Sequence, residues 1–248
     1  MSRTAPTREL KSTIHATSQA PKRGGLESEE FVQQSLLKAV MERRLKPGAK
    51  LNEDVLSEVF NISRTRVRKV LSLLGTQQVV THKPGYGTFI AKPSVQEARE
   101  LFEVRHGVEQ MLVRMIGANR PRLDFTALRR IVDEEKIGHE AHNASFIQLS
   151  GDFHLVLADL AGNNLLRTYM QQLVTRTILV LAVYSRQHVC LVDDHTEVLD
   201  ALESGDTEGA AQRMARHLHS IQTSCILRES DDEAADLRSI FQLVSGAP

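Results

Sequence analysis

The spacing of apolar residues in this 248-residue chain is helical except in one short stretch, and that stretch restricts the fold more than any other feature. Apolar side chains recur at helical spacing up to residue 75, and again from residue 94 to residue 227. Between these stretches lie two short β-prone runs, 79–82 and 88–91, joined by a Pro-Gly-Tyr-Gly turn that is typical of a hairpin. The sequence therefore predicts a mainly α-helical protein with one small β-hairpin.

Three short helices are predicted before the hairpin. The helical pattern of residues 27–44 ends at Lys46-Pro47-Gly48, which cannot continue a helix. A second helix is expected to open at Leu51-Asn52, with Asn52 as its N-cap, and a third to run from Ser63 to about Leu74. Three helices followed by a hairpin form the pattern of a winged helix-turn-helix, which binds DNA.

The rest of the chain shows no second set of strands and is predicted to be an antiparallel α-helical bundle. Its expected helices are 94–117, 124–140, 144–161, 165–187, 194–204 and 206–228. The chain is thus divided into a flexible arm (1–26), a winged helix-turn-helix domain (27–92), an all-helical domain (93–230) and a tail (231–248).

The charge of the chain is unevenly distributed. Residues 1–92 carry 16 Lys and Arg against 8 Asp and Glu, whereas the remainder carries 15 against 23. A basic first third indicates a module that binds a polyanion, although half of the excess comes from the arm, so charge alone does not exclude a simple basic tail.

Several absences exclude other classes of protein. The longest apolar run, residues 178–184, is far too short to span a membrane, and no apolar stretch follows the basic N-terminus. The two cysteines, Cys190 and Cys225, make no disulfide framework and suit a reducing compartment. We therefore expect a cytoplasmic protein with no membrane partner.

The start of the third helix, Ser63 to Lys69, carries four cations and two hydroxyls. A helix N-terminus offers free N–H groups and a positive dipole end to phosphate, and Arg can donate two hydrogen bonds to guanine. Arg64 and Arg68 share one face, while Arg66 projects nearly opposite Arg64. An ordinary solvated basic helix is the alternative, but the preceding short helix, tight turn and hairpin favour DNA binding.

A family resemblance is carried by motifs along residues 29–92. They are Arg44 to Leu51, Leu56, Phe60, Ser63-Arg64-Thr65, Val67-Arg68, Leu71, Leu74 and Gly85 to Ile90. This stretch resembles the DNA-binding domain of the GntR family, and the resemblance implies that Arg64, Thr65 and Arg68 meet operator DNA while Tyr86 and Gly87 approach the minor groove. Together with the neighbouring helix-start residues, the expected DNA-binding set is Ser63, Arg64, Thr65, Arg66, Arg68, Tyr86 and Gly87. Arg66 and Lys69 depart from the family pattern, which usually has Pro and Glu there, and both add positive charge.

Three histidines of the second domain lie on apolar helical stripes and are expected to face the bundle interior: His154, His195 and His217. His195 and His217 are 10 and 12 residues from a turn at Gly205, so their heights along the two helices should differ by only ~3 Å. Such an arrangement fits a metal site, and three separately hydrogen-bonded core histidines are the alternative.

The second domain resembles the FCD ligand-binding domain over about residues 95–225. The resemblance is carried by Leu101 to Arg105 with Glu109, by Phe153-His154 to Gly162-Asn163, and by His195 to Asp206 with Ala210, Met214 and His217-Leu218. It implies a ligand-binding domain and, in many members, a divalent metal, often zinc, held by an Asp and three histidines that match His154, His195 and His217. Ser150 stands where the Asp is expected, and Asp152 points about 200° away from His154, which puts the affinity for metal in doubt.

Arg105 shares its helical stripe with apolar residues and should face inward. A buried guanidinium requires an anion, and two remain possible: the internal carboxylate of Glu109, or, as the resemblance implies, the carboxylate of a small organic acid.

These features predict a transcription regulator, expected to be a repressor, that binds double-stranded operator DNA as a homodimer and responds to a small carboxylate effector. A metal-dependent enzyme using the three histidines is the alternative, but no general-base carboxylate lies on the stripes that carry them. An architectural DNA binder is a third possibility, and it would not need the interior polar residues.

Overall fold

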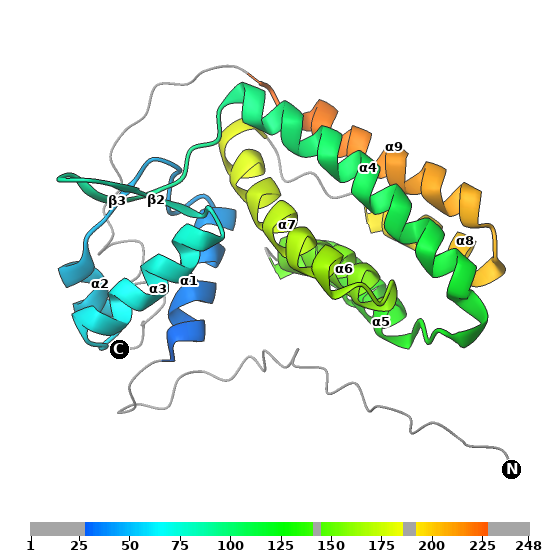
Figure 1. Ribbon diagram of the computed structural model, residues 1–248, viewed down its shortest axis with the longest axis horizontal. Helices are drawn as coiled ribbons and strands as arrows, with labels where there is room; N and C mark the ends of the chain where they lie inside the picture. Colours follow the sequence, from blue (N-terminus) through cyan, green and yellow to red (C-terminus); the bar gives the residue numbers. More distant parts are fainter. Residues whose placement is uncertain (1–27, 141–144, 186–191, 228–248) are drawn as a thin grey trace, which may run out of the picture.

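The computed structural model describes residues 28–140, 145–185 and 192–227, which form a mixed N-terminal domain followed by a bundle of helices (Figure 1). The predicted arm, residues 1–26, and the predicted tail, 231–248, lie outside the described residues. None of the described helices combines the length and apolar character needed to cross a membrane.

The N-terminal domain is the predicted winged helix-turn-helix. Its elements are α1 (Glu29–Met41), β1 (Lys50–Leu51), α2 (Glu53–Val59), α3 (Arg64–Thr76), β2 (Val80–Lys83) and β3 (Gly87–Ile90). Side-chain oxygens of Ser28, Asn52 and Ser63 accept hydrogen bonds from the first turns of α1, α2 and α3, so each helix begins at a residue that caps it. The hairpin of β2 and β3 is confirmed.

Two details of this domain differ from the prediction. Residues 50–51 form a strand that pairs antiparallel with β3, Lys50 opposite Phe89, and the sheet order is β1-β3-β2. We expected Leu51 to open a helix, because a two-residue strand leaves no periodic signal. The first helix ends at Met41 rather than Arg44, since Arg43 adopts a positive φ of 56°.

The second domain is the predicted helical bundle. It comprises α4 (Val95–Asn119), the short 3-10 helix η1 (Arg120–Arg122), α5 (Thr126–Glu140), α6 (Ser145–Leu160), α7 (Asn164–Tyr184), α8 (Val192–Ser204) and α9 (Thr207–Ser224). Helix α4 lies along α9, α5 along α6, and α8 along α9 (Figure 1). The turn between α8 and α9 is made at Gly205, whose φ of 88° favours glycine.

Helix α7 belongs to both domains. Its residues Ile178, Leu179 and Ala182 pack into the hydrophobic core of the winged helix-turn-helix. At its C-terminal end, the guanidinium of Arg43 donates to the carbonyl oxygens of Leu181, at 3.3 Å, and Ser185. A cation that binds the last carbonyls of a helix is favoured by the helix dipole, so α7 is held to the DNA-binding domain by both apolar and polar contacts.

Candidate functional site

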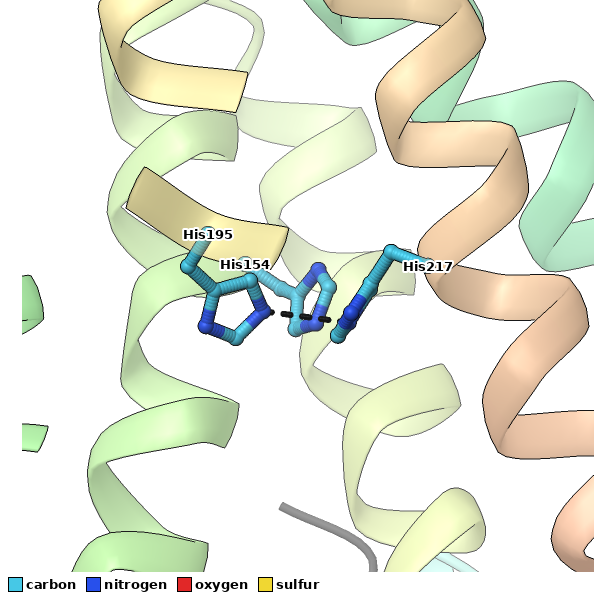
Figure 2. A group of neighbouring side chains, drawn as sticks. All are labelled: His154, His195 and His217. Atoms are coloured by element: carbon cyan, nitrogen blue, oxygen red, sulfur yellow. Dashed lines mark hydrogen bonds between the residues drawn. The ribbon is translucent and has the colours of Figure 1, made fainter. Parts of the chain in front are cut away.

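The imidazole rings of His154 on α6, His195 on α8 and His217 on α9 meet inside the bundle (Figure 2). Their ring centroids are 4.3 to 5.3 Å apart, and each side chain is at most 3% exposed. One ligand nitrogen from each ring lies within 4.8 Å of the others, which is the spacing of a metal-binding group. The structure therefore brings together the three histidines that the helical stripes predicted to face inward.

Each of these histidines also meets a carboxylate through its Nδ1 atom. The Nδ1 to carboxylate oxygen distances are 2.5 Å for His154 with Glu109, 2.8 Å for His195 with Glu135, and 3.3 Å for His217 with Asp194. Metal-binding histidines typically pair their second nitrogen with a carboxylate in this way, which fixes the tautomer and the orientation of the ring.

The tautomers follow from these contacts. A carboxylate accepts a hydrogen bond only from a protonated Nδ1, so in a neutral ring the Nε2 atom carries a lone pair. The Nε2 atoms of His195 and His217 are 3.0 Å apart, and two lone pairs at that distance repel each other unless a cation or a shared proton lies between them. The three side chains thus fit a divalent metal better than three independent hydrogen-bonded histidines.

Electrostatics favours the neutral, metal-binding form of His154 and His217. Burial lowers the pKa of His154 to about 4, although Glu109 opposes the shift, and burial also holds the pKa of His217 well below its usual value. Burial would raise the pKa of Glu109, but the charge of Arg105 and the contact with His154 outweigh it and lower the pKa to about 2. At neutral pH the site therefore holds an ionised Glu109 beside the uncharged imidazoles of His154 and His217.

Arg105 lies next to this cluster and is 2% exposed. Its Nε donates to Glu109 at 2.6 Å and its Nη1 donates to Thr177 on α7 at 3.0 Å. The internal partner expected from the sequence is thus present. The Nη2 atom, however, is buried without a hydrogen-bond partner, and a buried cationic donor without an acceptor is costly. An incoming carboxylate oxygen would satisfy it.

The fourth protein ligand of the family pattern is missing. Ser150, at the position of the expected Asp, is half-buried and offers a hydroxyl instead of a carboxylate. Asp152 does not belong to the metal-binding group that the described residues form; burial raises its pKa to about 6, against the opposing charge of Arg167. Three histidines would fill only three coordination positions of a metal, which leaves a further position for water or for an anionic molecule.

The expected DNA-binding residues lie at the start of α3 and at the turn between β2 and β3. Arg64, Thr65 and Arg68 are exposed at the start of α3, whereas Arg66 is half-buried. Tyr86, at the turn of the hairpin, is 73% exposed. Acidic residues that the sequence analysis did not single out approach the cations of α3, and their arrangement is described below.

Three further residues of the histidine site were missed. Glu135 occupies the same helical stripe as the buried Leu128 and Ile131, so a carboxylate on an apolar face was a signal that could have found it. Thr177 gave no such signal, because its partner Arg105 lies on a helix far away in the sequence, whereas Asp194 could have been found from its place on α8, level with His217 across the turn at Gly205.

Comparisons with known proteins agree with this architecture. Residues 28–90 match the family model described as bacterial regulatory proteins, gntR family, and residues 100–220 match the model of the FCD domain. The HTH-type transcriptional repressor RspR of Escherichia coli is 25% identical over 195 residues, covering 77% of this chain and 84% of RspR. The HTH-type transcriptional regulator LutR of Bacillus subtilis is 27% identical over 206 residues, covering 72% of this chain and 92% of LutR.

A solved structure shows the same fold. The GntR transcriptional regulator from Rhodococcus sp. RHA1 superposes with a TM-score of 0.68 at 24% identity, over 79% of this chain and 95% of that protein. The family and the relatives named above are transcription regulators rather than enzymes. The chain therefore belongs to the GntR family of DNA-binding transcription regulators, in the subgroup that carries an FCD domain.

Proposed function

We propose that this regulator acts in the cytoplasm as a repressor whose homodimer binds a two-fold operator and responds to a small organic acid held in the helical domain. One observation carries the proposal: three buried imidazoles converge on a possible metal site, and Arg105, which shares the Glu109 carboxylate with His154, has a buried Nη2 atom without a partner. Metal and guanidinium together are the chemistry that selects a carboxylate.

His154, His195 and His217 would hold the metal, with zinc the leading candidate because imidazole is among its preferred ligands. The metal would supply a positive centre that an effector oxygen can bind. Because Ser150 supplies no carboxylate, an oxygen of the effector would fill the coordination position that the missing Asp leaves open. Arg105 would bind the same effector through Nη2 while its Nε stays on Glu109.

The DNA contacts proposed are those at the start of α3, where Ser63, Arg64, Thr65 and Arg68 would reach a major groove. Arg66, which was also expected to contact DNA, is half-buried and pairs with Glu29 instead. The hairpin tip with Tyr86 and Gly87 would lie in the adjacent minor groove. Support comes from the match to the gntR family model over residues 28–90 and from the exposure of five of these residues: Ser63, Arg64, Thr65, Arg68 and Tyr86. Two copies related by two-fold symmetry would read the two half-sites.

Helix α7 provides a route from the effector to the DNA. Thr177 accepts a hydrogen bond from Arg105 on one side of the helix, and the next residues, Ile178 and Leu179, pack into the DNA-binding domain. An effector that draws Arg105 away from Thr177 would release a restraint on this helix. The helix would then change the balance between arrangements of the DNA-binding domains that fit or do not fit the operator.

The experiment begins with selection of bound duplexes from a random pool, with and without a panel of small carboxylic acids and zinc. Arg64→Ala should abolish preference for the selected duplex while leaving the oligomeric state unchanged. His195→Ala should keep DNA binding but blunt the response to the acid, and His219→Ala, on an exposed face of α9, is the matched control. A normal acid response in His195→Ala would place the sensing site elsewhere.

A further inference from the structure

Every cation at the start of α3 has a carboxylate partner from another helix. The pairs are Arg64 with Asp54 at 2.6 Å, Arg68 with Glu53 at 2.7 Å, Lys69 with Glu29 at 2.7 Å and Arg66 with Glu29 at 3.5 Å. Carboxylates are repelled by the phosphates of DNA, so their presence beside these cations requires an explanation.

The first two pairs share one geometry. Asp54 and Glu53 are consecutive residues in the first turn of α2, and each contacts its arginine at Nε. A carboxylate on Nε fixes the plane of the guanidinium and directs the Nη1 and Nη2 atoms away from itself. Those two atoms can donate together to the O6 and N7 atoms of guanine.

A simpler explanation covers only part of this arrangement. Acidic residues in a first turn stabilise a helix through its dipole, and α2 would gain from Glu53 and Asp54 without any arginine. The arginines are 65% and 68% exposed, and ion pairs so exposed add little to the stability of a fold. The pairs therefore have little structural value in water, whereas in a groove from which water is excluded they would be much stronger.

The third carboxylate, Glu29, pairs with the two cations that Asp54 and Glu53 do not contact. Glu29 lies in the first turn of α1 and contacts both Lys69 and Arg66, and these contacts lower its pKa. Arg66 and Lys69 are the positions at which this chain departs from the family pattern. Their additional charge is thus balanced within the protein and directed toward α1.

We propose that Asp54 and Glu53 are positioning residues that aim Arg64 and Arg68 at two guanines of each half-site, while Glu29 withholds Arg66 and Lys69 from the DNA. Because Arg64 and Arg68 are one helical turn apart, about 6 Å, the two guanines lie within about two base pairs of each other. The inference rests on the proposed operator contacts of α3, and it adds which bases are read and which residues set that preference.

The test measures base preference and salt dependence separately. Duplexes selected by the wild-type protein are varied one base pair at a time, and their binding is compared with that of a random duplex for Asp54→Ala, Asp54→Asn and Asp54→Glu. Asp54→Ala should lose about tenfold of the preference for guanine at one position, consistent with the value of one bidentate contact. Its affinity for random DNA at low salt should be unchanged or higher, because a negative charge is removed. Asp54→Glu should restore the base preference.

Glu30→Gln is the matched control, because it removes the same charge next to Glu29 from a residue that is exposed and lies outside the four pairs. It should change neither base preference nor the salt dependence of binding. Glu29→Gln should steepen the dependence of log K on log salt by about one to two units, as Arg66 and Lys69 reach phosphates.

The outcomes separate this proposal from the one it rests on. If the wild-type protein selects no duplex, or if Arg64→Ala keeps the full preference, the operator contacts themselves are wrong and this inference falls with them. If Arg64→Ala loses the preference but Asp54→Ala and Asp54→Asn both keep it, only the positioning role is overturned. An unchanged salt dependence in Glu29→Gln overturns the withholding of Arg66 and Lys69.

Discussion

Mild acid should destabilise the metal-free protein through His154. Because burial lowers the pKa of this ring to about 4 from an ordinary value of 6.5, the unfolded chain binds a proton between these two values that the folded chain does not. The free energy of unfolding is therefore fully retained above pH 6.5 and falls as the pH drops toward 4. A full shift of this size corresponds to about 3 kcal/mol, of which about 2 kcal/mol is lost between pH 7 and pH 5.

The assay is the thermal midpoint of the helical CD signal in the presence of a chelator, at pH 7 and pH 5. For a chain of this length a loss of about 2 kcal/mol lowers the midpoint by roughly 4 to 8 °C. Glu109 does not contribute to the change between pH 7 and pH 5. Its pKa is lowered from 4.5 to about 2, so the stability that its ionised form provides is lost only at lower pH, as the carboxylate becomes protonated. His154→Gln should reduce the difference between the two pH values, and His219→Gln, which removes an exposed ring, should keep it. An equal difference in wild type and His154→Gln would refute the reasoning.

Three further predictions follow from the same site and from α7. Glu135→Gln should lower zinc affinity by about 10- to 100-fold in calorimetric titration, because His195 loses the carboxylate that orients its ring. Glu134→Gln, which changes an exposed neighbour, should leave the affinity unchanged. Equal zinc affinities of the two variants would exclude the orienting role. Arg105→Met should lower the free energy of unfolding by about 3–5 kcal/mol, because it leaves the Glu109 carboxylate buried without its cation. In denaturant unfolding, the double variant Arg105→Met with Glu109→Gln should recover part of that loss. A double variant no more stable than Arg105→Met would contradict this explanation. Arg43→Ala should leave operator affinity near wild type but weaken the response to the effector in a DNA-binding titration, and an unaltered response would remove α7 from the proposed route.

The sequence predicted much of the fold because each helix carries its own local signal. Stripes of apolar residues indicated which way His154, His195 and His217 face, and the count from Gly205 placed two of them at one height. Caps at Asn52 and Ser63 marked where α2 and α3 begin, and the structure confirms both.

What the sequence did not reveal depends on contacts between distant segments. The hydrogen bonds of Glu135 with His195 and of Arg105 with Thr177 join residues 60 and 72 positions apart, and no local pattern encodes them. The same holds for the strand at Lys50-Leu51, which exists only because β3 is beside it, and for the Glu29 contacts, which join α1 to α3.

The sharing of Leu179 between domains has a consequence for how such regulators can be recombined. A fragment that stops at Pro93 would lose one wall of its hydrophobic core and expose the apolar surface that α7 now covers. A chimera that joins this DNA reader to a foreign sensor would therefore need a replacement for the α7 surface as well as a new linker. The two domains are in this respect difficult to separate, because a single helix completes the hydrophobic core of one and accepts a hydrogen bond from the buried Arg105 of the other.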